Sequence, residues 1–381
     1  MKKSPWLSVA ALTYLAVFVT GGIYTLVKQV LVLPFPFSIF MDYNFYSQAL
    51  MRALSGGDMY SIREIGEAFL YPPPSLLFVE ILHLIPDPIA QGAVFAMLDF
   101  FMAAALVYLV CKKYSISLEK TIFLLAVTLT YAPLLLTAYG GQINMLTGFG
   151  LGLLFIFGLT NPWLAGLGLA LAIVTKMTPL YFLLFLLATK NFQVLWRTAL
   201  ALAGFILLGA LRYGLVPFFT YIDVFRGMTG TIPTGAKSQA LSVLLTNAGL
   251  HVNLGLVQLG MTVFLLSIIL LSSWQTWRGG PPEALFIITA MAMLLSPNIL
   301  WYHHYVFFLL PLVGWITWQN QSRTVLAWCL AGMLIIQFDY FLLTGGLLVH
   351  FFGVLSILAV LFQSSQRPGT LKAANPELAA R

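Results

Sequence analysis

Apolar segments of about 20 residues recur from one end of this sequence to the other, and they restrict the fold more than any other feature. A helix of that length crosses the hydrocarbon core of a bilayer. Inside that core the backbone must satisfy its own hydrogen bonds, which favours helices. The composition agrees, since 60% of the residues are hydrophobic and 8% are charged, whereas soluble domains are about one-quarter charged. We therefore predict an all-α, polytopic integral membrane protein.

The basic residues predict how the segments cross. Residues 75–85 are apolar but only about half a bilayer long, and we expect them not to cross. The lysines and arginines between apolar segments then fall mostly on the side of Lys2 and Lys3, as the positive-inside rule requires. About twelve spans follow, with both chain ends in the cytoplasm: 6–27, 89–111, 120–138, 143–159, 162–175, 178–189, 198–216, 253–273, 283–297, 303–318, 324–342 and 345–362.

One transmembrane domain is expected over residues 1–363, followed by a polar, cytoplasmic and disordered tail over 364–381. The formal charge of +7 comes from basic residues scattered singly or in pairs. This pattern indicates topology signals and membrane lipids as neighbours rather than nucleic acid. Cys111 and Cys329 lie in or at the ends of apolar segments, so a disulfide framework is not expected.

The first outer loop, residues 34–74, concentrates charge in a chain that has little of it: Asp42, Arg52, Asp58, Arg63, Glu64 and Glu67. Residues 44–54 and 61–70 show helical spacing of apolar side chains, which predicts two amphipathic helices lying flat at the interface. Asp42 stands among Phe40, Met41 and Tyr43, where desolvation would raise its pKa and make it a better proton acceptor. The alternative is that Asp42 caps the helix that follows.

Polar stretches between later spans face the same side in this topology. In Gly141-Gln142-Ile143-Asn144 the amides can bond a sugar or phosphate, although a tight hairpin capped by Asn144 would use the same residues. Lys176 lies at an outer helix end, where a lipid-linked phosphate would pair with it unless it extends to the interface. Arg212 is a further candidate cation.

The run Trp301-Tyr302-His303-His304-Tyr305 opens a later span. Adjacent side chains on a helix point about 100° apart, which argues against a pair of histidine metal ligands. One histidine donating to a phosphate is a better interpretation, and an interfacial aromatic belt is the alternative.

Together these motifs resemble the polyprenol-phosphate-mannose-dependent glycosyltransferases of the GT-C superfamily, glycosyltransferase family 87. The mycobacterial phosphatidylinositol-mannoside mannosyltransferases belong to that group. The motifs appear in the expected order: Asp42 with Tyr46, Gly57 with Tyr60, Tyr71-Pro72-Pro73, Gly141-Gln142 with Asn144, Lys176 with Pro179, and Ser296-Pro297 followed by Trp301, His303, His304 and Pro311.

The resemblance implies a GT-C fold and an enzyme of the bacterial cytoplasmic membrane. It would move a hexose, by this analogy mannose, from a polyprenyl monophosphate to a lipid or glycan acceptor on the non-cytoplasmic face. Asp42 would be the general base of a single inverting displacement, and a hydrolase would need a second facing carboxylate. Lys176, Arg212, His303 and His304 are expected at the donor phosphate; Tyr43, Tyr46, Asp58, Tyr60, Tyr71, Gln142 and Asn144 are expected at the sugar or acceptor.

By the same resemblance no metal or other cofactor is expected: metal-dependent relatives carry further acidic residues in the second outer loop, which here is Gly141-Gln142-Ile143-Asn144 and has no carboxylate. A secondary transporter is one alternative, but it would carry charges near the midplane and show repeated halves. A lipid-linked glycan ligase or polymerase is another. Such enzymes use a large late outer loop with paired arginines, whereas residues 216–240 carry only Arg226 and Lys237.

Overall fold

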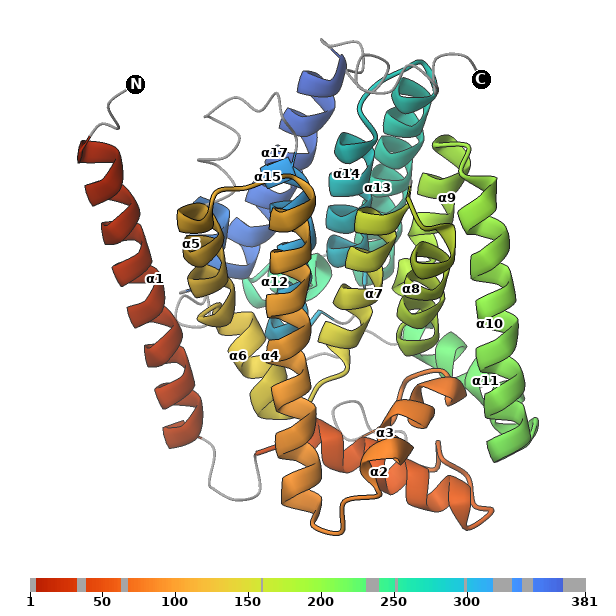
Figure 1. Cartoon of the computed structure of the whole chain (residues 1–381). Coiled ribbons are helices and arrows are strands. Elements are labelled where there is room, and N and C mark those ends of the chain that lie inside the picture. Colours follow the sequence, from red (N-terminus) through yellow and green to blue (C-terminus); the bar gives the residue numbers. More distant parts are fainter. Residues whose placement is uncertain are drawn as a thin grey trace.

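The computed structural model describes residues 5–32, 39–62, 68–158, 160–230, 240–250, 253–297, 300–317, 331–337 and 345–365, and these residues form helices and connecting turns (Figure 1). The longest helices are α1 (Pro5–Val32), α4 (Pro88–Lys113), α10 (Phe192–Tyr213), α13 (Leu254–Trp277) and α17 (Gly345–Ser365). Shorter ones are α5 (Leu118–Leu129), α6 (Ala132–Gly140), α7 (Asn144–Phe157), α8 (Pro162–Thr175), α9 (Tyr181–Ala188), α12 (Leu241–Asn247), α14 (Pro282–Leu295) and α15 (Leu309–Thr317). The first outer loop contains α2 (Met41–Leu54), α3 (Leu76–Leu82) follows the loop, and α11 (Val216–Gly230) follows α10.

Four helices in the described part of the chain, α1, α4, α10 and α13, are long and apolar enough to cross a membrane. The pair α5 and α6, bent by 50° at its break, would be a fifth span. The other predicted spans up to residue 318 coincide with shorter apolar helices, so the expected number of about twelve spans remains a prediction. The span at 324–342 falls mostly outside the described residues, and the tail after residue 365 falls wholly outside them.

The amphipathic helix predicted at 44–54 is present as α2, which begins at Met41 and buries Tyr43, Tyr46, Ala49 and Leu50 on one face. The second one, at 61–70, is not seen at its described ends, because residues 61–62 and 68–70 are not helical and 63–67 lie outside the description. The half-length apolar segment at 75–85 contains α3, whose seven residues are far too few to cross a bilayer.

Helices α2, α3 and α11 lie at the end of the molecule opposite the start of α1 and the end of α17 (Figure 1). The connection from α4 to α5 and the one from α9 to α10 lie toward the end where α1 begins. The structure therefore gathers the first outer loop and the start of α11 at one end of the helical bundle.

The break between α5 and α6 is stabilised by a distant amide. Gln337, in the helix over 331–337, donates through Nε2 to the carbonyl oxygens of Thr130 (2.8 Å) and Phe18 (2.7 Å). Its Oε1 accepts from the backbone N–H of Ala132 at 2.8 Å. An interrupted helix leaves backbone groups without intrahelical partners, and leaving one unpaired when buried costs about 1–3 kcal/mol. Gln337 thus pairs with the backbone groups left free at the α5–α6 break and links α1 to the same point.

The middle of the bundle is built on close backbone contact between α7 and α8. A methyl group on Gly150 or on Gly168 would overlap the carbonyl oxygen of the other residue. Small residues allow helices in a membrane to approach this closely. The packing holds the N-terminal end of α7 next to the C-terminal end of α8, where the candidate site lies.

Candidate active site

Helix α2 is joined to the end of α6 before its first turn begins. Phe40 has a left-handed backbone (φ 56°), and its N–H donates to the carbonyl oxygen of Tyr139 at 2.8 Å. Helix α2 then begins at Met41, so Asp42 lies within the first turn and not at the capping position. The capping alternative for Asp42 is therefore not the one the chain adopts.

Asp42 is partly buried beside the turn that follows α6. A Cβ atom added to Gly140 would lie 2.9 Å from Asp42 Oδ2, which shows how closely the carboxylate approaches this turn. Desolvation raises the pKa of Asp42 to about 6, and a hydrogen bond from the Gln142 side chain offsets part of that effect. A carboxylate with such a pKa is ionised near neutral pH and is a stronger base than an exposed aspartate.

Gln142 connects Asp42 to two tyrosine hydroxyls. Its Oε1 accepts from Tyr46 Oη at 3.1 Å and from Tyr71 Oη at 3.3 Å, and the two hydroxyls lie 3.2 Å apart. Tyr46 and Gln142 are both buried. A polar network therefore runs from Asp42 on α2, through the α6–α7 turn, to Tyr71 at the end of the first outer loop.

The remaining loop candidates have partners within the loop and its surroundings. Tyr43 donates to Gln91 Oε1 at 3.0 Å, and Tyr60 donates to the carbonyl oxygen of Tyr71 at 2.7 Å. Asp58 is exposed, and its Oδ1 accepts from the backbone N–H of Tyr60 at 2.9 Å. Tyr60 thus holds the backbone of Tyr71, and Asp58 holds the backbone of Tyr60.

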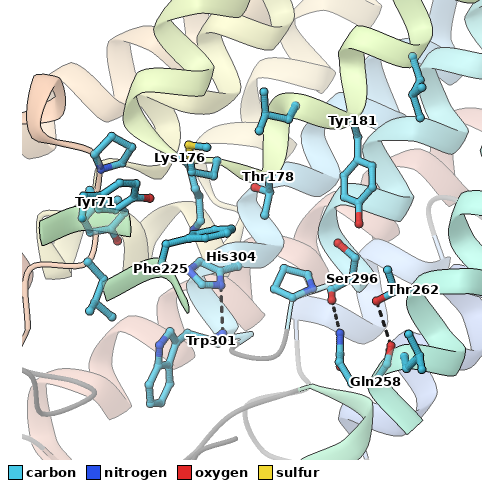
Figure 2. A pocket seen from close by; sticks show the side chains of 18 of the residues that line it. Tyr71, Lys176, Thr178, Tyr181, Phe225, Gln258, Thr262, Ser296, Trp301 and His304 are labelled. Carbon is cyan, nitrogen blue, oxygen red and sulfur yellow. Dashed lines mark hydrogen bonds between the residues drawn. The ribbon is translucent and has the colours of Figure 1, made fainter. Parts of the chain in front are cut away.

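A cavity of about 860 Å³ opens beside Tyr71 (Figure 2). Its walls come from the end of the first outer loop, the α8–α9 break, α11, α13, residues 296–297 and residues 301–304. Polar side chains on these walls are Tyr71, Lys176, Thr178, Tyr181, Tyr221, Gln258, Thr262, Ser296, Trp301 and His304. The remaining wall is largely apolar: Leu70, Pro72, Met177, Leu180, Leu184, Phe225, Leu259 and Pro297.

Lys176 enters the cavity at the break between α8 and the 3₁₀ turn Thr178–Leu180. Its Nζ donates to Asn144 Oδ1 at 3.0 Å and lies 5.4 Å from the centre of the Phe307 ring. An ammonium group has three donors, and Asn144 takes one of them. Asn144 is the first residue of α7 and makes no capping bond, so the capped-hairpin alternative is not adopted.

His304 is oriented by the backbone of Trp301. The Trp301 N–H donates to His304 Nδ1 at 3.2 Å (Figure 2). A neutral ring that accepts at Nδ1 carries its proton at Nε2, so His304 has one N–H donor left for a ligand. His303 packs edge-on against His304 with ring centres 4.7 Å apart, and it is not among the residues that line the cavity.

Arg212 does not line the cavity in the described structure. Its Nε donates to Glu80 Oε1 at 2.6 Å, and Tyr213 Oη donates to Glu80 Oε2 at 2.8 Å. The pairing joins the end of α10 to α3. Glu80 could not be identified as the partner of Arg212 from sequence patterns, because the two residues lie far apart in the chain.

The wall of the cavity on α13 was not predicted from the sequence. Thr262 donates to the carbonyl oxygen of Gln258, whose side chain donates to the carbonyl oxygen of Ser296 (Figure 2). Polar residues four positions apart on an otherwise apolar helix share a face, and that spacing could have indicated them. Among the described residues, no group of three His, Cys, Asp or Glu side chains could hold a metal ion.

Comparison with known protein families identifies the class. The model for "Glycosyltransferase family 87" matches residues 69–297, which is more than half of the chain. The chain belongs to glycosyltransferase family 87. The matched region contains Tyr71, Gln142, Asn144 and Lys176, whereas Asp42 and the two histidines lie outside it. A search among curated proteins finds no match.

Membership in this family confirms the predicted family and indicates a membrane glycosyltransferase with a sugar donor and an acceptor as substrates. The described part of the chain is helical, with several apolar helices able to span a membrane, which agrees with the expected all-α membrane class; the GT-C fold remains a prediction.

Proposed function

We propose that this glycosyltransferase moves a hexose, mannose, from a polyprenyl monophosphate to a hydroxyl group of a lipid or glycan acceptor. The reaction would take place on the non-cytoplasmic face of the bacterial cytoplasmic membrane. The observation that carries the proposal is the cavity, in which Lys176 and His304 lie on the same walls as a set of apolar side chains. An amphiphile with an anionic head and a hydrocarbon chain matches such walls. The choice of mannose rests on the resemblance of the sequence motifs.

The donor phosphate would bind between Lys176 and His304. Lys176 supplies a positive charge, and its bond to Asn144 fixes the position of the ammonium group. His304 supplies the N–H of its Nε2. Hydrogen bonds from charged or fixed donors become stronger where water is excluded, and they act on charge that develops in the transition state. Both groups would therefore stabilise the departing phosphate.

The isoprenoid chain would run along the apolar wall between α9 and α13. Leu180 and Leu184 form one side, and Leu259 the other. An isoprenoid chain that leaves the bilayer hydrocarbon meets apolar side chains at this wall, so no polar group loses its partner when the chain binds. This wall favours a lipid-linked donor over a soluble sugar nucleotide.

In the proposed reaction the acceptor oxygen attacks C1 of the hexose while the bond between C1 and the phosphate oxygen breaks. Asp42 takes the proton of the acceptor hydroxyl, and polyprenyl phosphate leaves with the bonding electrons. The anomeric configuration inverts because there is one displacement. A phosphate leaves without a general acid, so one carboxylate is enough, in contrast to hydrolases that use two.

The sugar would lie next to Tyr71, which borders the cavity and is joined to Asp42 through Gln142. The first outer loop, with Tyr43, Asp58 and Tyr60, would form the acceptor side. No metal takes part in this scheme.

The purified protein in lipid vesicles, given radiolabelled mannosyl polyprenyl phosphate and a membrane lipid extract, tests the proposal. Label should move from the donor to a new glycolipid or glycan, whereas labelled GDP-mannose should give no product. Transfer from GDP-mannose alone would overturn the lipid-linked donor. Uptake of intact label into the vesicles without cleavage of the sugar–phosphate bond would favour a transporter.

A further inference from the structure

The Gln142 side chain is buried and makes its contacts within the protein. Two tyrosine hydroxyls, from Tyr46 and Tyr71, donate to Oε1 at 3.1 and 3.3 Å. The Asp42 carboxylate lies next to this side chain: a Cβ atom built on Gly140 would be 2.9 Å from Asp42 Oδ2 and 3.6 Å from Gln142 Cγ, and a hydrogen bond from Gln142 lowers the pKa of Asp42. Gln142 is buried, and the cavity walls do not include it. A sugar ligand would need a free amide group, and Gln142 does not present one.

The chemistry of these partners fixes which way the amide points. An ionised carboxylate only accepts hydrogen bonds, so the group facing Asp42 must be the Nε2 amide. The hydroxyls of Tyr46 and Tyr71 supply the protons for Oε1 on the other side. A rotated amide would place its oxygen against the carboxylate oxygens of Asp42, where neither group has a proton to donate.

The backbone of the turn holds Gln142 at this point. The Gln142 N–H donates to the carbonyl oxygen of Thr137 at 2.9 Å. The preceding residue, Gly141, has a left-handed backbone (φ 68°), and a Cβ atom there would lie 2.7 Å from Tyr43 Cβ. Glycine is the residue that adopts this conformation without strain, and it alone leaves room for Tyr43. The turn thus fixes the position of Gln142 next to the start of α2, which carries Asp42.

We propose that Gln142 is a positioning residue: its amide, oriented by Tyr46 and Tyr71, directs the Asp42 carboxylate toward the acceptor hydroxyl. This inference rests on the proposed function, in which Asp42 is the base. Because Tyr71 borders the cavity, the same three-residue network connects the cavity wall to the base. Sequence analysis had placed Gln142 among the sugar or acceptor ligands, and its new role is to act through Asp42.

The test is a pH titration of Asp42 by infrared spectroscopy on the purified protein in detergent. The carboxylic acid band of Asp42 is assigned by its loss in Asp42→Asn, and its midpoint in the wild type should be at about pH 6. A hydrogen bond to a charged group that is lost should raise the midpoint by about one pH unit in Gln142→Leu. Tyr46→Phe combined with Tyr71→Phe, which leaves Gln142 in place, should raise it by a smaller amount.

The matched control is Asn144→Leu, which removes the other amide of the same turn. Asn144 bonds Lys176 and not Asp42, so the Asp42 midpoint should stay where it is in the wild type. In the transfer assay, Gln142→Leu should lower kcat with little change in the KM of the donor. An unchanged midpoint in Gln142→Leu and in the double tyrosine variant would overturn the positioning role, as would an equal shift in Asn144→Leu.

The titration does not depend on catalysis, so the two proposals can fail separately. An unmoved midpoint removes the role of Gln142 and leaves Asp42 as the base. Full transfer activity in Asp42→Asn removes the base itself, and the positioning role of Gln142 with it.

Discussion

Replacing Asp42 by asparagine should stabilise the protein, and the gain should depend on pH. Burial raises the pKa of Asp42 from its ordinary 3.8 to about 6. The pKa of Asp42 is therefore roughly two units higher in the folded state than in the unfolded state. This difference destabilises the fold by at most about 3 kcal/mol when the carboxylate is ionised. Asparagine has a similar shape, keeps an acceptor for Gln142 and carries no charge.

The sign follows from linkage. A group whose pKa is higher in the folded state stabilises the fold at pH values below its unfolded pKa, and this contribution is lost as the pH rises through the folded pKa. In the wild type, the loss of folding free energy from burying ionised Asp42 should therefore be complete at pH 8, about half as large at pH 5, and small at pH 4. Asp42→Asn avoids this cost at every pH.

The assay is thermal or denaturant unfolding in detergent, followed by tryptophan fluorescence at pH 8 and pH 5. At pH 8, Asp42→Asn should unfold at a higher temperature or denaturant concentration than the wild type. The difference in stability between the two should be about half as large at pH 5. The control is Asp223→Asn, because Asp223 is an exposed carboxylate on α11 and pays no burial cost. An Asp42→Asn variant that is no more stable than wild type at pH 8, or whose advantage is the same at both pH values, would refute the reasoning.

Three further predictions concern the transfer reaction. The rate at low substrate should be constant above about pH 7 and fall by about tenfold per pH unit well below pH 6, because the base must be ionised; a flat profile would contradict the pKa of about 6 for Asp42. Lys176→Met should raise the KM of the lipid donor by about tenfold or more, whereas Lys190→Met, at the far end of α9 where the lysine stacks on Trp277, should not; equal effects would remove Lys176 from the donor site. Activity should survive EDTA, and a loss that Mg²⁺ or Mn²⁺ restores would overturn the metal-free scheme.

The positions of the helices could be predicted from the sequence because hydropathy is a local property. The segments expected at 89–111 and 253–273 correspond to α4 and α13 within a few residues. The break between α5 and α6 could not be predicted this way, since residues 120–138 are almost continuously apolar. Pro133 was the available signal. The amide that makes the break tolerable comes from Gln337, about two hundred residues further along the chain.

The candidate site was predicted as a set of residues but not as a set of pairs. Lys176, His304 and Tyr71 line the same cavity, and the first two had been selected from their residue type and their place at the end of a segment. The pairing of Gln142 with Asp42 and of Asn144 with Lys176 depends on tertiary contacts that spacing does not encode. Both amides had been expected to bind the sugar or acceptor. In the structure Gln142 lies next to Asp42, and Asn144 accepts a hydrogen bond from Lys176.

The central claim is that the Asp42 carboxylate takes the proton of the acceptor, and the most direct measurement is the rate of mannosyl transfer by Asp42→Asn beside wild type under identical conditions. The account predicts that this variant folds normally and that its rate falls by about a hundredfold or more. A folded Asp42→Asn protein that transfers the sugar at the wild-type rate would contradict it.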